Sequence, residues 1–292
     1  MFCFNCTACI TQKIPYGYAD SKVGLVQFFE NLSIGFCSRC KIPQVEHAAL
    51  SPEKLNQYYS FVYRSKTNLE PHTAILGCSP YFTARADAQI ALIKKYISQS
   101  DVRHVFEFGA GYGYALKAIQ RQFPSAKLYT NECDQTIKFL SDIHQYAAEI
   151  QYDVVIMSHV LEHLEYPQNY LANILNNLKK GGILFIEVPV QTQELRQKNV
   201  IMEPHVTFFT LSTLRSFMSR HFGSQLEILY SGTAGRYTGD IGLLTRVRRS
   251  IRYRFARLLR LPLKTHGHGS MGFDNDTRKN VWDNVRIVCR NR

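Results

Sequence analysis

The feature that most constrains the fold is a glycine-rich stretch in the first half of the chain. An apolar run, Val105–Phe108, carries one acid at Glu107, and Gly109, Gly111 and Gly113 follow it at alternate positions. An amphipathic run comes next. This order predicts a strand, a tight loop and a helix, the start of a βαβ unit that holds a nucleotide-type ligand. Glycines let such a loop take positive φ and approach the ligand closely.

Strand-like and helix-like runs alternate through the rest of the central region. The alternation predicts an α/β fold with a mostly parallel sheet covered on both sides. The cations and glycines of Lys179–Gly182 predict the end of a helix. We expect strands at 105–108, 127–131, 138–141, 152–157 and 183–189, helices at 83–97 and 170–178, and a final antiparallel strand at 284–289.

Polar side chains at the ends of the expected strands are candidate ligand contacts. Glu132 ends the second strand, where a carboxylate can accept hydrogen bonds from both ribose hydroxyls, and Asp134 is the near alternative. Asp142 ends the third expected strand and could accept a hydrogen bond from an adenine amino group. Ser158 and His159 follow the fourth strand and are expected to face the ligand.

Five of the eight cysteines lie near the amino end. Two C-x-x-C pairs can supply four thiolates to a tetrahedral Zn²⁺, which would replace the core that a small unit lacks. Cys3/Cys6 and Cys6/Cys9 are both possible first pairs, and Cys37/Cys40 is the second. A set of reduced, buried cysteines is the alternative. A redox pair is not expected, because no βαβ pattern surrounds these cysteines.

The sequence divides into four expected units. These are a zinc-binding unit at 1–60, linking and lid helices at 61–100, the ligand-binding domain at 101–240, and a basic amphipathic helix with the final strand at 241–292. The apolar fraction of 45% suits a globular protein with a sizeable core. The apolar runs are too short to span a membrane, and the first residues do not resemble a signal peptide, so we expect a cytoplasmic protein.

The formal net charge of +12 indicates an anionic partner. The stretch Thr245–Lys264 is rich in arginine, contains no acid and carries apolar residues at helical spacing. It could pack on the domain with a solvated basic face. It could equally contact a phosphorylated substrate, lipid head groups or RNA. We expect a small or carrier-linked anionic substrate, with nucleic acid and peripheral membrane contact as lesser alternatives.

Several motifs occur together in the order found in one enzyme family. The segments YDVVIMSHVLEHLEYP, LKKGGILFIEVP and EPHVTFFTLSTLRSFM follow the glycine loop. Together they resemble class I S-adenosylmethionine-dependent methyltransferases, within the group that carries an amino-terminal zinc unit and includes sugar C-methyltransferases. The resemblance implies a Rossmann-like, doubly wound, seven-stranded sheet. The carboxyl-terminal part departs from the group, because it is shorter than the second α/β domain of those sugar enzymes.

The resemblance also implies roles for individual residues. Glu107 would lie near the methionine amino group of S-adenosylmethionine. His205 would lie over the methyl group, and histidine suits a general base because it titrates near neutral pH. His159 and His163 are alternative bases, and Tyr63 could cover the substrate. A nucleotide sugar or glycan precursor is the expected acceptor, methylated on carbon or oxygen.

The sequence leaves alternatives open. His159-x-x-Glu162-His163 matches a metalloprotease pattern, but that pattern requires one long helix, whereas this one directly follows a buried strand. Some methyltransferases hold a divalent ion at this place, and these residues with His205 could do so. An RNA methyltransferase using the zinc unit and arginine-rich helix is one alternative function. A cofactor-binding module without catalysis is the other.

Overall fold

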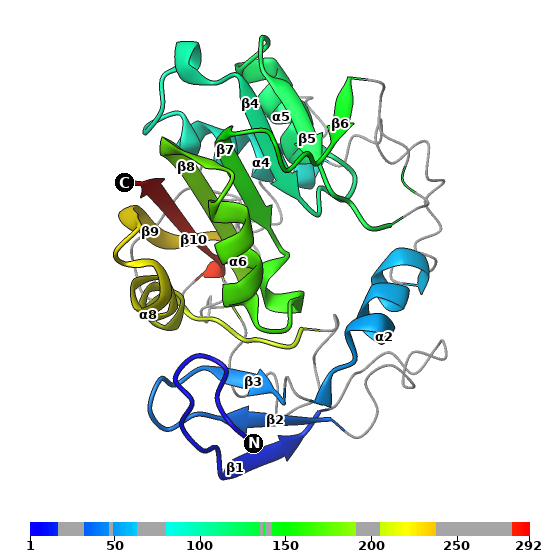
Figure 1. Ribbon diagram of the computed structural model, residues 1–292, viewed down its shortest axis with the longest axis vertical. Helices are drawn as coiled ribbons and strands as arrows, with labels where there is room; N and C mark the ends of the chain where they lie inside the picture. The colour runs from blue at the N-terminus through cyan, green and yellow to red at the C-terminus, as the bar shows by residue number, and fades with distance from the viewer. Residues whose placement is uncertain are drawn as a thin grey trace, which may run out of the picture.

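The computed structural model describes residues 1–16, 32–46, 49–62, 80–134, 137, 142–190, 205–237 and 282–292. Its main feature is a seven-stranded sheet with the order β6-β5-β4-β7-β8-β10-β9 (Figure 1). The strands are β4 (His104–Phe108), β5 (Lys127–Thr130), β6 (Ile143–Gln145), β7 (Tyr152–Ser158), β8 (Leu178–Pro189), β9 (Leu226–Tyr237) and β10 (Trp282–Asn291).

The first five of these strands run parallel, and β10 is antiparallel to both of its neighbours. This arrangement confirms the predicted α/β fold with a mostly parallel, seven-stranded sheet. It also places the last residues of the chain inside the main domain, because β10 lies between β8 and β9. The expected final antiparallel strand is therefore confirmed.

Helices cover both faces of the sheet, as a buried parallel sheet requires. The helices α4 (Pro80–Ile93) and α5 (Tyr114–Gln122) pack on one face. The helices α6 (Pro167–Leu175) and α8 (Leu211–Phe222) pack on the other (Figure 1). Alternate residues of β7 serve the two layers: Val154 and Ile156 face the first pair of helices, and Val155 and Met157 face the second.

One detail of the predicted elements is corrected. The run Lys179–Gly182 does not close a helix, because α6 already ends at Leu175 and the run belongs to the long strand β8. Gly181 has a φ of +79° there, so this glycine allows an irregular start of β8 and does not end a helix. The expected strand 138–141 lies outside the described residues, and the third parallel strand, β6, begins only after Asp142.

The amino-terminal unit is a three-stranded antiparallel sheet of β1 (Gln12–Pro15), β2 (Ser33–Phe36) and β3 (Pro43–Val45). The short helix α2 (Pro52–Gln57) and the π-helical turn η2 (Tyr58–Val62) follow it. Strand β3 continues onto the main domain through main-chain hydrogen bonds. The Val45 amide donates to the Val206 carbonyl at 2.8 Å, and the Phe208 amide donates to the Pro43 carbonyl at 3.0 Å.

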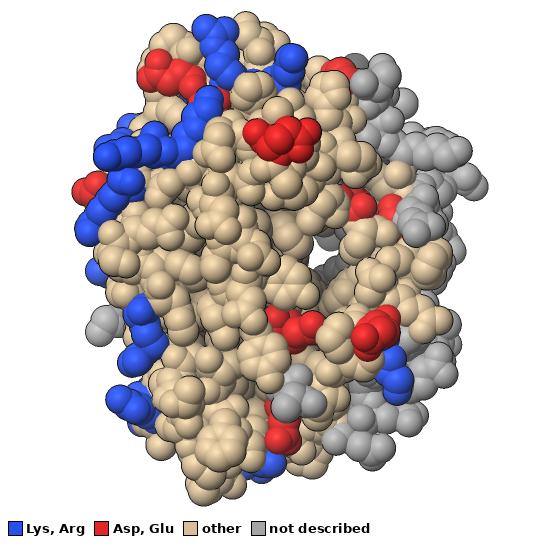
Figure 2. All heavy atoms as spheres, in the orientation of Figure 1, with Lys and Arg blue, Asp and Glu red and all other residues tan. Residues whose placement is uncertain are grey.

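The surface carries two visible features on the face shown in Figure 2. Lys and Arg side chains gather along one edge, and the face is hollowed between the main domain and the region of α2. Within the described part of the chain, no helix combines the length and the apolar character needed to cross a membrane. The predicted arginine-rich helix at 245–264 lies outside the described residues.

Candidate functional site

The glycine loop lies where β4 gives way to α5. Gly109, Gly111 and Gly113 have φ values of +62°, +57° and +71°. A side chain at Gly109 would also collide with Val160, because a Cβ there would lie 2.9 Å from Cγ2 of that residue. The loop therefore requires glycine both for its backbone conformation and for its close packing.

The acid at the end of the next strand faces this loop. The Gly111 amide donates to Oε2 of Glu132 at 2.6 Å, and the Asp134 amide donates to Oε1 at 3.0 Å. The Gly109 amide donates to Oδ1 of Asn131 at 3.2 Å. The predicted pair of glycine loop and Glu132 is thus brought together.

Glu107 is buried just behind the loop, with 3% of its surface exposed. Burial, followed by the nearby Glu132 carboxylate, raises the pKa of Glu107 to about 8. Its Oε2 atom has no hydrogen-bond partner among the described residues. A buried carboxylate oxygen without a partner beside a glycine loop fits the ammonium group of S-adenosylmethionine, because the cation would both pair with it and favour its charged form.

Asp142 lies apart from this group. It precedes β6, so it lies at the amino end of that strand, whereas the glycine loop lies at the carboxyl edge of the sheet. Its Oδ2 atom accepts a hydrogen bond from Gln120 Nε2 of α5 at 2.5 Å. Asp142 thus precedes β6 rather than following it, and its adenine contact stays a prediction.

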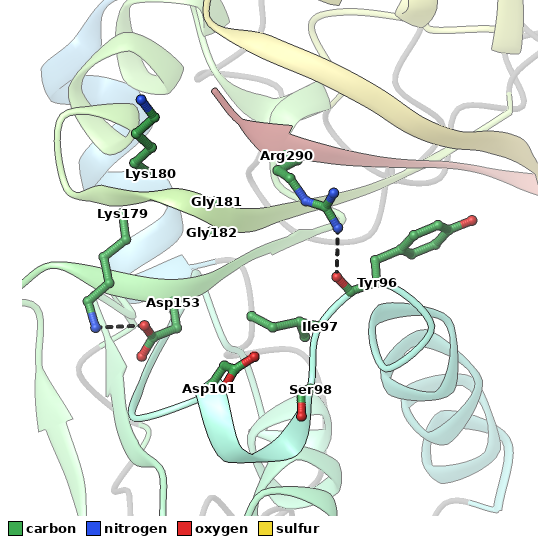
Figure 3. A pocket seen from close by; sticks show the side chains of 10 residues that line it. All are labelled: Tyr96, Ile97, Ser98, Asp101, Asp153, Lys179, Lys180, Gly181, Gly182 and Arg290. Atoms are coloured by element: carbon green, nitrogen blue, oxygen red, sulfur yellow. Dashed lines mark hydrogen bonds and ion pairs between the residues drawn. The ribbon is translucent and has the colours of Figure 1, made fainter.

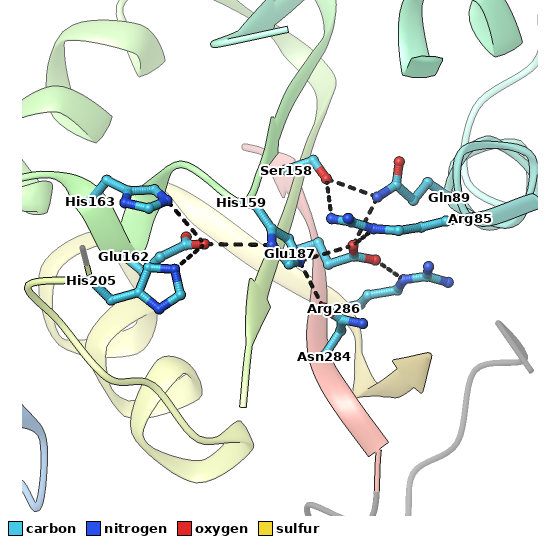
Figure 4. A network of polar contacts seen from close by, with 10 residues as sticks. All are labelled: Arg85, Gln89, Ser158, His159, Glu162, His163, Glu187, His205, Asn284 and Arg286. Carbon is cyan, nitrogen blue, oxygen red and sulfur yellow. Dashed lines mark hydrogen bonds and ion pairs between the residues drawn. The ribbon is translucent and has the colours of Figure 1, made fainter. Parts of the chain in front are cut away.

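A buried polar network that the sequence did not reveal lies at the carboxyl ends of β7 and β8 (Figure 4). Oε1 of Glu187 accepts from Arg85 Nε at 2.5 Å, and its Oε2 accepts from Arg286 Nε at 2.5 Å. Burial alone would raise the pKa of Glu187, but Arg286, Arg85 and His159 together lower it to about 2. Gln89 Nε2 donates to both Glu187 and Ser158.

The network fixes the two predicted residues after β7. Ser158 Oγ accepts from Arg85 Nη2 at 3.0 Å. His159 has a φ of +55°, and its Nε2 lies 2.7 Å from Oδ1 of Asn284 on β10. Because an amide oxygen can only accept, Nε2 carries the proton and Nδ1 is the acceptor nitrogen, which lies 3.8 Å from Glu162 Oε1. The network could have been suspected only from Glu187, an acid within a strongly apolar strand.

The remaining predicted histidines form a buried cluster. Glu162 and His163 lie in the 3₁₀ turn η4 (Leu161–His163), directly after β7. Their ligand atoms and those of His205 all lie within 4.8 Å of one another. The His205 side chain is only 4% exposed, whereas that of His159 is 27% exposed. Tyr63 lies outside the described residues.

Four of the five amino-terminal cysteines converge. The Sγ atoms of Cys3, Cys6, Cys37 and Cys40 lie within 4.8 Å of one another, and Cys9 is exposed outside the cluster. Both C-x-x-C turns are built alike. The Thr7 amide donates to the Cys3 carbonyl and the Lys41 amide to the Cys37 carbonyl, and both donor residues have positive φ. This repeated turn selects Cys3/Cys6 as the first pair.

The cluster fits a structural Zn²⁺ by its chemistry. Four sulfurs about 2.3 Å from a tetrahedral ion are a preferred zinc environment. Closest approaches of 3.4 Å for Cys3–Cys40 and 3.5 Å for Cys6–Cys37 are compatible with that geometry. A hydrogen bond from Cys3 lowers the pKa of Cys40, so one thiolate is already favoured.

A cavity elsewhere does not belong to this site. It has a volume of ≈330 Å³ and lies at the amino ends of β7 and β8, the opposite edge of the sheet from the glycine loop (Figure 3). Two of its three cations have partners, since Lys179 Nζ pairs with Asp153 at 2.6 Å and Arg290 donates to the Tyr96 carbonyl at 3.0 Å. None of the predicted cofactor residues lines it.

The fold and the glycine loop together define a doubly wound domain that binds a nucleotide-type ligand at the carboxyl edge of its sheet. Residues 82–226 match a family model described as a methyltransferase domain. This part of the chain is a class I S-adenosylmethionine-dependent methyltransferase domain.

Several proteins that this chain resembles are named as methyltransferases. The ubiquinone biosynthesis O-methyltransferase of Rickettsia bellii is 29% identical over 93 residues, 32% of this chain and 39% of that protein. Its counterpart in Rickettsia canadensis is 34% identical over 73 residues, 25% of this chain and 31% of that protein. The chain therefore matches about two fifths or less of these relatives. The structure of the plantazolicin methyltransferase BpumL with SAH has 14% identity and a TM-score of 0.47, covering 82% of this chain and 94% of that chain.

The cysteine cluster predicts a metal-dependent amino-terminal unit. Replacing one of the four thiolates, Cys6→Ser, should remove most of the bound zinc and lower the melting temperature by several degrees, because the unit has little core without the metal. Cys9→Ser is the matched control, since Cys9 lies outside the cluster. Metal content and thermal unfolding measure the effect. Equal zinc content in the two variants would contradict the assignment.

Glu107 predicts a specific pH dependence of stability. Its pKa is about 8 in the folded protein against an ordinary 4.5, so the folded state binds the proton more tightly. The contribution of Glu107 to stability is therefore greatest at low pH and is lost as the pH rises from about 4.5 to about 8, by on the order of a few kcal/mol. The Glu107→Gln variant without cofactor should lose much less stability over that range, as followed by melting temperature. The exposed control Glu149→Gln should behave like wild type.

Proposed function

We propose that this protein transfers a methyl group from S-adenosylmethionine to an oxygen of a small-molecule or carrier-linked acceptor. The observation that carries the proposal is the glycine loop, whose three positive-φ glycines are tied to Glu132 and backed by the partnerless oxygen of Glu107. The direct test is to substitute a residue of this group. The substitution should weaken cofactor binding and, as a consequence, methyl transfer.

Each cofactor contact has a chemical reason. Gly109, Gly111 and Gly113 carry no side chains that would block the approach of S-adenosylmethionine to the loop. Glu132 accepts from ribose hydroxyls, in place of or beside the Gly111 amide that it now binds. Glu107 pairs with the methionine ammonium. S-adenosylmethionine supplies an activated methyl group on a sulfonium, so the chain's main task is to align the acceptor with it.

We place the proton acceptor at His159. The side chain is partly exposed at the carboxyl edge of β7, and its Nε2 proton is held by Asn284. Its protonated form gains from the carboxylates of Glu187 at 3.6 Å and Glu162 at 3.8 Å. The acceptor hydroxyl would give its proton to Nδ1 while its oxygen bonds to the methyl carbon and the carbon–sulfur electron pair stays on sulfur. His205, the first choice from sequence, is enclosed by the described residues.

The acceptor is proposed from weaker support. The Rickettsia relatives are named for O-methylation in ubiquinone biosynthesis, which favours oxygen as the methylated atom. We keep a nucleotide sugar or glycan precursor as a second proposed acceptor, because the amino-terminal cysteine unit resembles the zinc unit of sugar methyltransferases. A screen should therefore include phenols, nucleotide sugars and short peptides, with S-adenosylhomocysteine formation as the readout. Cofactor binding without transfer to any of them would favour the non-catalytic alternative.

Cofactor binding is expected to depend on Glu132. The Glu132→Gln variant keeps the shape of the side chain but weakens its acceptance from ribose hydroxyls, so the Kd for S-adenosylmethionine should rise about 10-fold or more. Isothermal titration calorimetry measures the change. The exposed Glu149→Gln variant should bind like wild type. An unchanged Kd in Glu132→Gln would contradict the proposal that the cofactor binds at Glu132 and the glycine loop.

Turnover is expected to depend on His159 in a different way. With an acceptor found in the screen, His159→Gln should lower kcat about 10²- to 10⁴-fold with little change in the Kd for S-adenosylmethionine, because the residue acts on the acceptor proton. A variant that keeps wild-type kcat would refute the role of His159 as the base.

A further inference from the structure

The cavity at the amino ends of β7 and β8 lies at the edge of the sheet opposite the glycine loop and has no part in the proposed reaction (Figure 3). Its volume of ≈330 Å³ lies at the lower end of the range of small-molecule sites. Some lining residues, such as Ser98 and Gly181, are exposed, whereas Asp153 and Gly182 are buried. A small ligand can therefore enter from solvent and reach buried groups.

The cavity is formed at an irregular start of β8. Between two paired positions of β7 and β8, Asp153 alone lies opposite the four residues Lys179–Gly182, so these residues cannot all pair with β7. Gly181 has a φ of +79°, and the space that a side chain there would occupy is open. The main chain of this glycine is therefore accessible to a ligand in the cavity.

The buried acid of the cavity is already neutralised. Asp153 Oδ1 pairs with Lys179 Nζ at 2.6 Å, and Oδ2 accepts from the Arg103 and His104 amides at 2.7 and 2.8 Å. Burial, followed by the charge of Lys179, lowers the pKa of His104, although Asp153 opposes this shift. The positive charge thus has the larger effect beside Asp153, and this acid needs no cationic ligand.

Arg290 favours an anionic ligand. It lies on β10, lines the cavity and is partly exposed. Its Nη2 atom donates to the Tyr96 carbonyl at 3.0 Å, which holds the guanidinium in position. In the described part of the chain this is its only side-chain hydrogen bond and it forms no ion pair, so other N–H groups stay available. A guanidinium presents parallel donors that match two oxygens of a phosphate or carboxylate.

We propose that this cavity binds a small compound through a phosphate or carboxylate group, at a site separate from the cofactor loop. Arg290 binds the oxyanion, and the exposed Lys180 adds attraction from the rim. The lining carries three cations and two acids, so its net charge is +1. Asp101, an exposed acid of the lining, weakens the attraction and favours small ligands whose charge stays close to Arg290.

Inorganic phosphate is the first probe. Calorimetric titration of the full chain at constant ionic strength should show a saturable site, and Arg290→Gln should raise the Kd for phosphate about 10-fold or more. Arg103→Gln is the matched control, because it removes the same charge from an exposed arginine outside the cavity, and it should bind like wild type. Asp101→Asn should lower the Kd, because it removes a repelling carboxylate, whereas the exposed Glu149→Gln should leave it unchanged.

Equal phosphate Kd values in wild type and folded Arg290→Gln would overturn the proposal, and so would a wild-type chain without saturable binding. Circular dichroism checks folding. If Arg290→Gln does not fold, the exposed Lys180→Gln variant replaces it and should raise the Kd about 2- to 5-fold, and an unchanged value there would count against the site.

Titration in the presence of S-adenosylmethionine locates the anion. Phosphate and cofactor should bind together, because the cavity and the glycine loop lie at opposite edges of the sheet. Displacement of phosphate by the cofactor would place the anion at the glycine loop and refute the cavity site. Parallel titrations with glycerol phosphate and with glycerate distinguish a phosphate monoester from a carboxylate, and the compound that binds more tightly identifies the head group.

Discussion

The segment 206–208 joins the cysteine unit to the main domain, and the arrangement of this protein depends on it. On one side its main chain pairs with β3 of the cysteine unit, and on the other its amides donate to the Glu162 carbonyl in the turn after β7. Hydrogen bonds of the main chain are short and directional, so they fix relative positions better than apolar packing alone. The cysteine unit, His205 and the carboxyl edge of the sheet are therefore located by one continuous set of bonds.

The buried Glu187 has a comparable role within the main domain. It joins Arg85 of α4 to Arg286 of β10, two residues far apart in sequence, across the strand that carries it. Burying these charges is costly, and removing one partner would leave an uncompensated charge. The arrangement also sets the conformation at the end of β7. Arg85 donates to Ser158 Oγ, and His159 Nε2 lies 3.6 Å from Glu187 Oε1.

Sequence reasoning succeeded where the signal was local. The glycine loop and Glu132 follow from turn chemistry and from the edge where parallel strands end, and the C-x-x-C turns follow from ligand spacing. It failed where distant pairing decides. Lys179–Gly182 carries helix-ending residues but belongs to β8, which pairs with β7 and β10. The partners of Glu187 could not be predicted from the sequence, because α4 and β10 come together only in the folded sheet.

Gln44 links the cysteine cluster to the segment 206–208. This fully buried residue donates through Nε2 to Cys3 Sγ at 3.1 Å, accepts from the Phe4 amide at 2.9 Å and bridges to Thr207 through its main chain. One side chain thus touches a cysteine of the cluster while its backbone supports the residues beside His205. Coupling between sites is reciprocal. If a metal bound by the four thiolates orders residues 205–207 and so strengthens ligand binding at the carboxyl edge, a ligand held at that edge strengthens binding of that metal by the same factor.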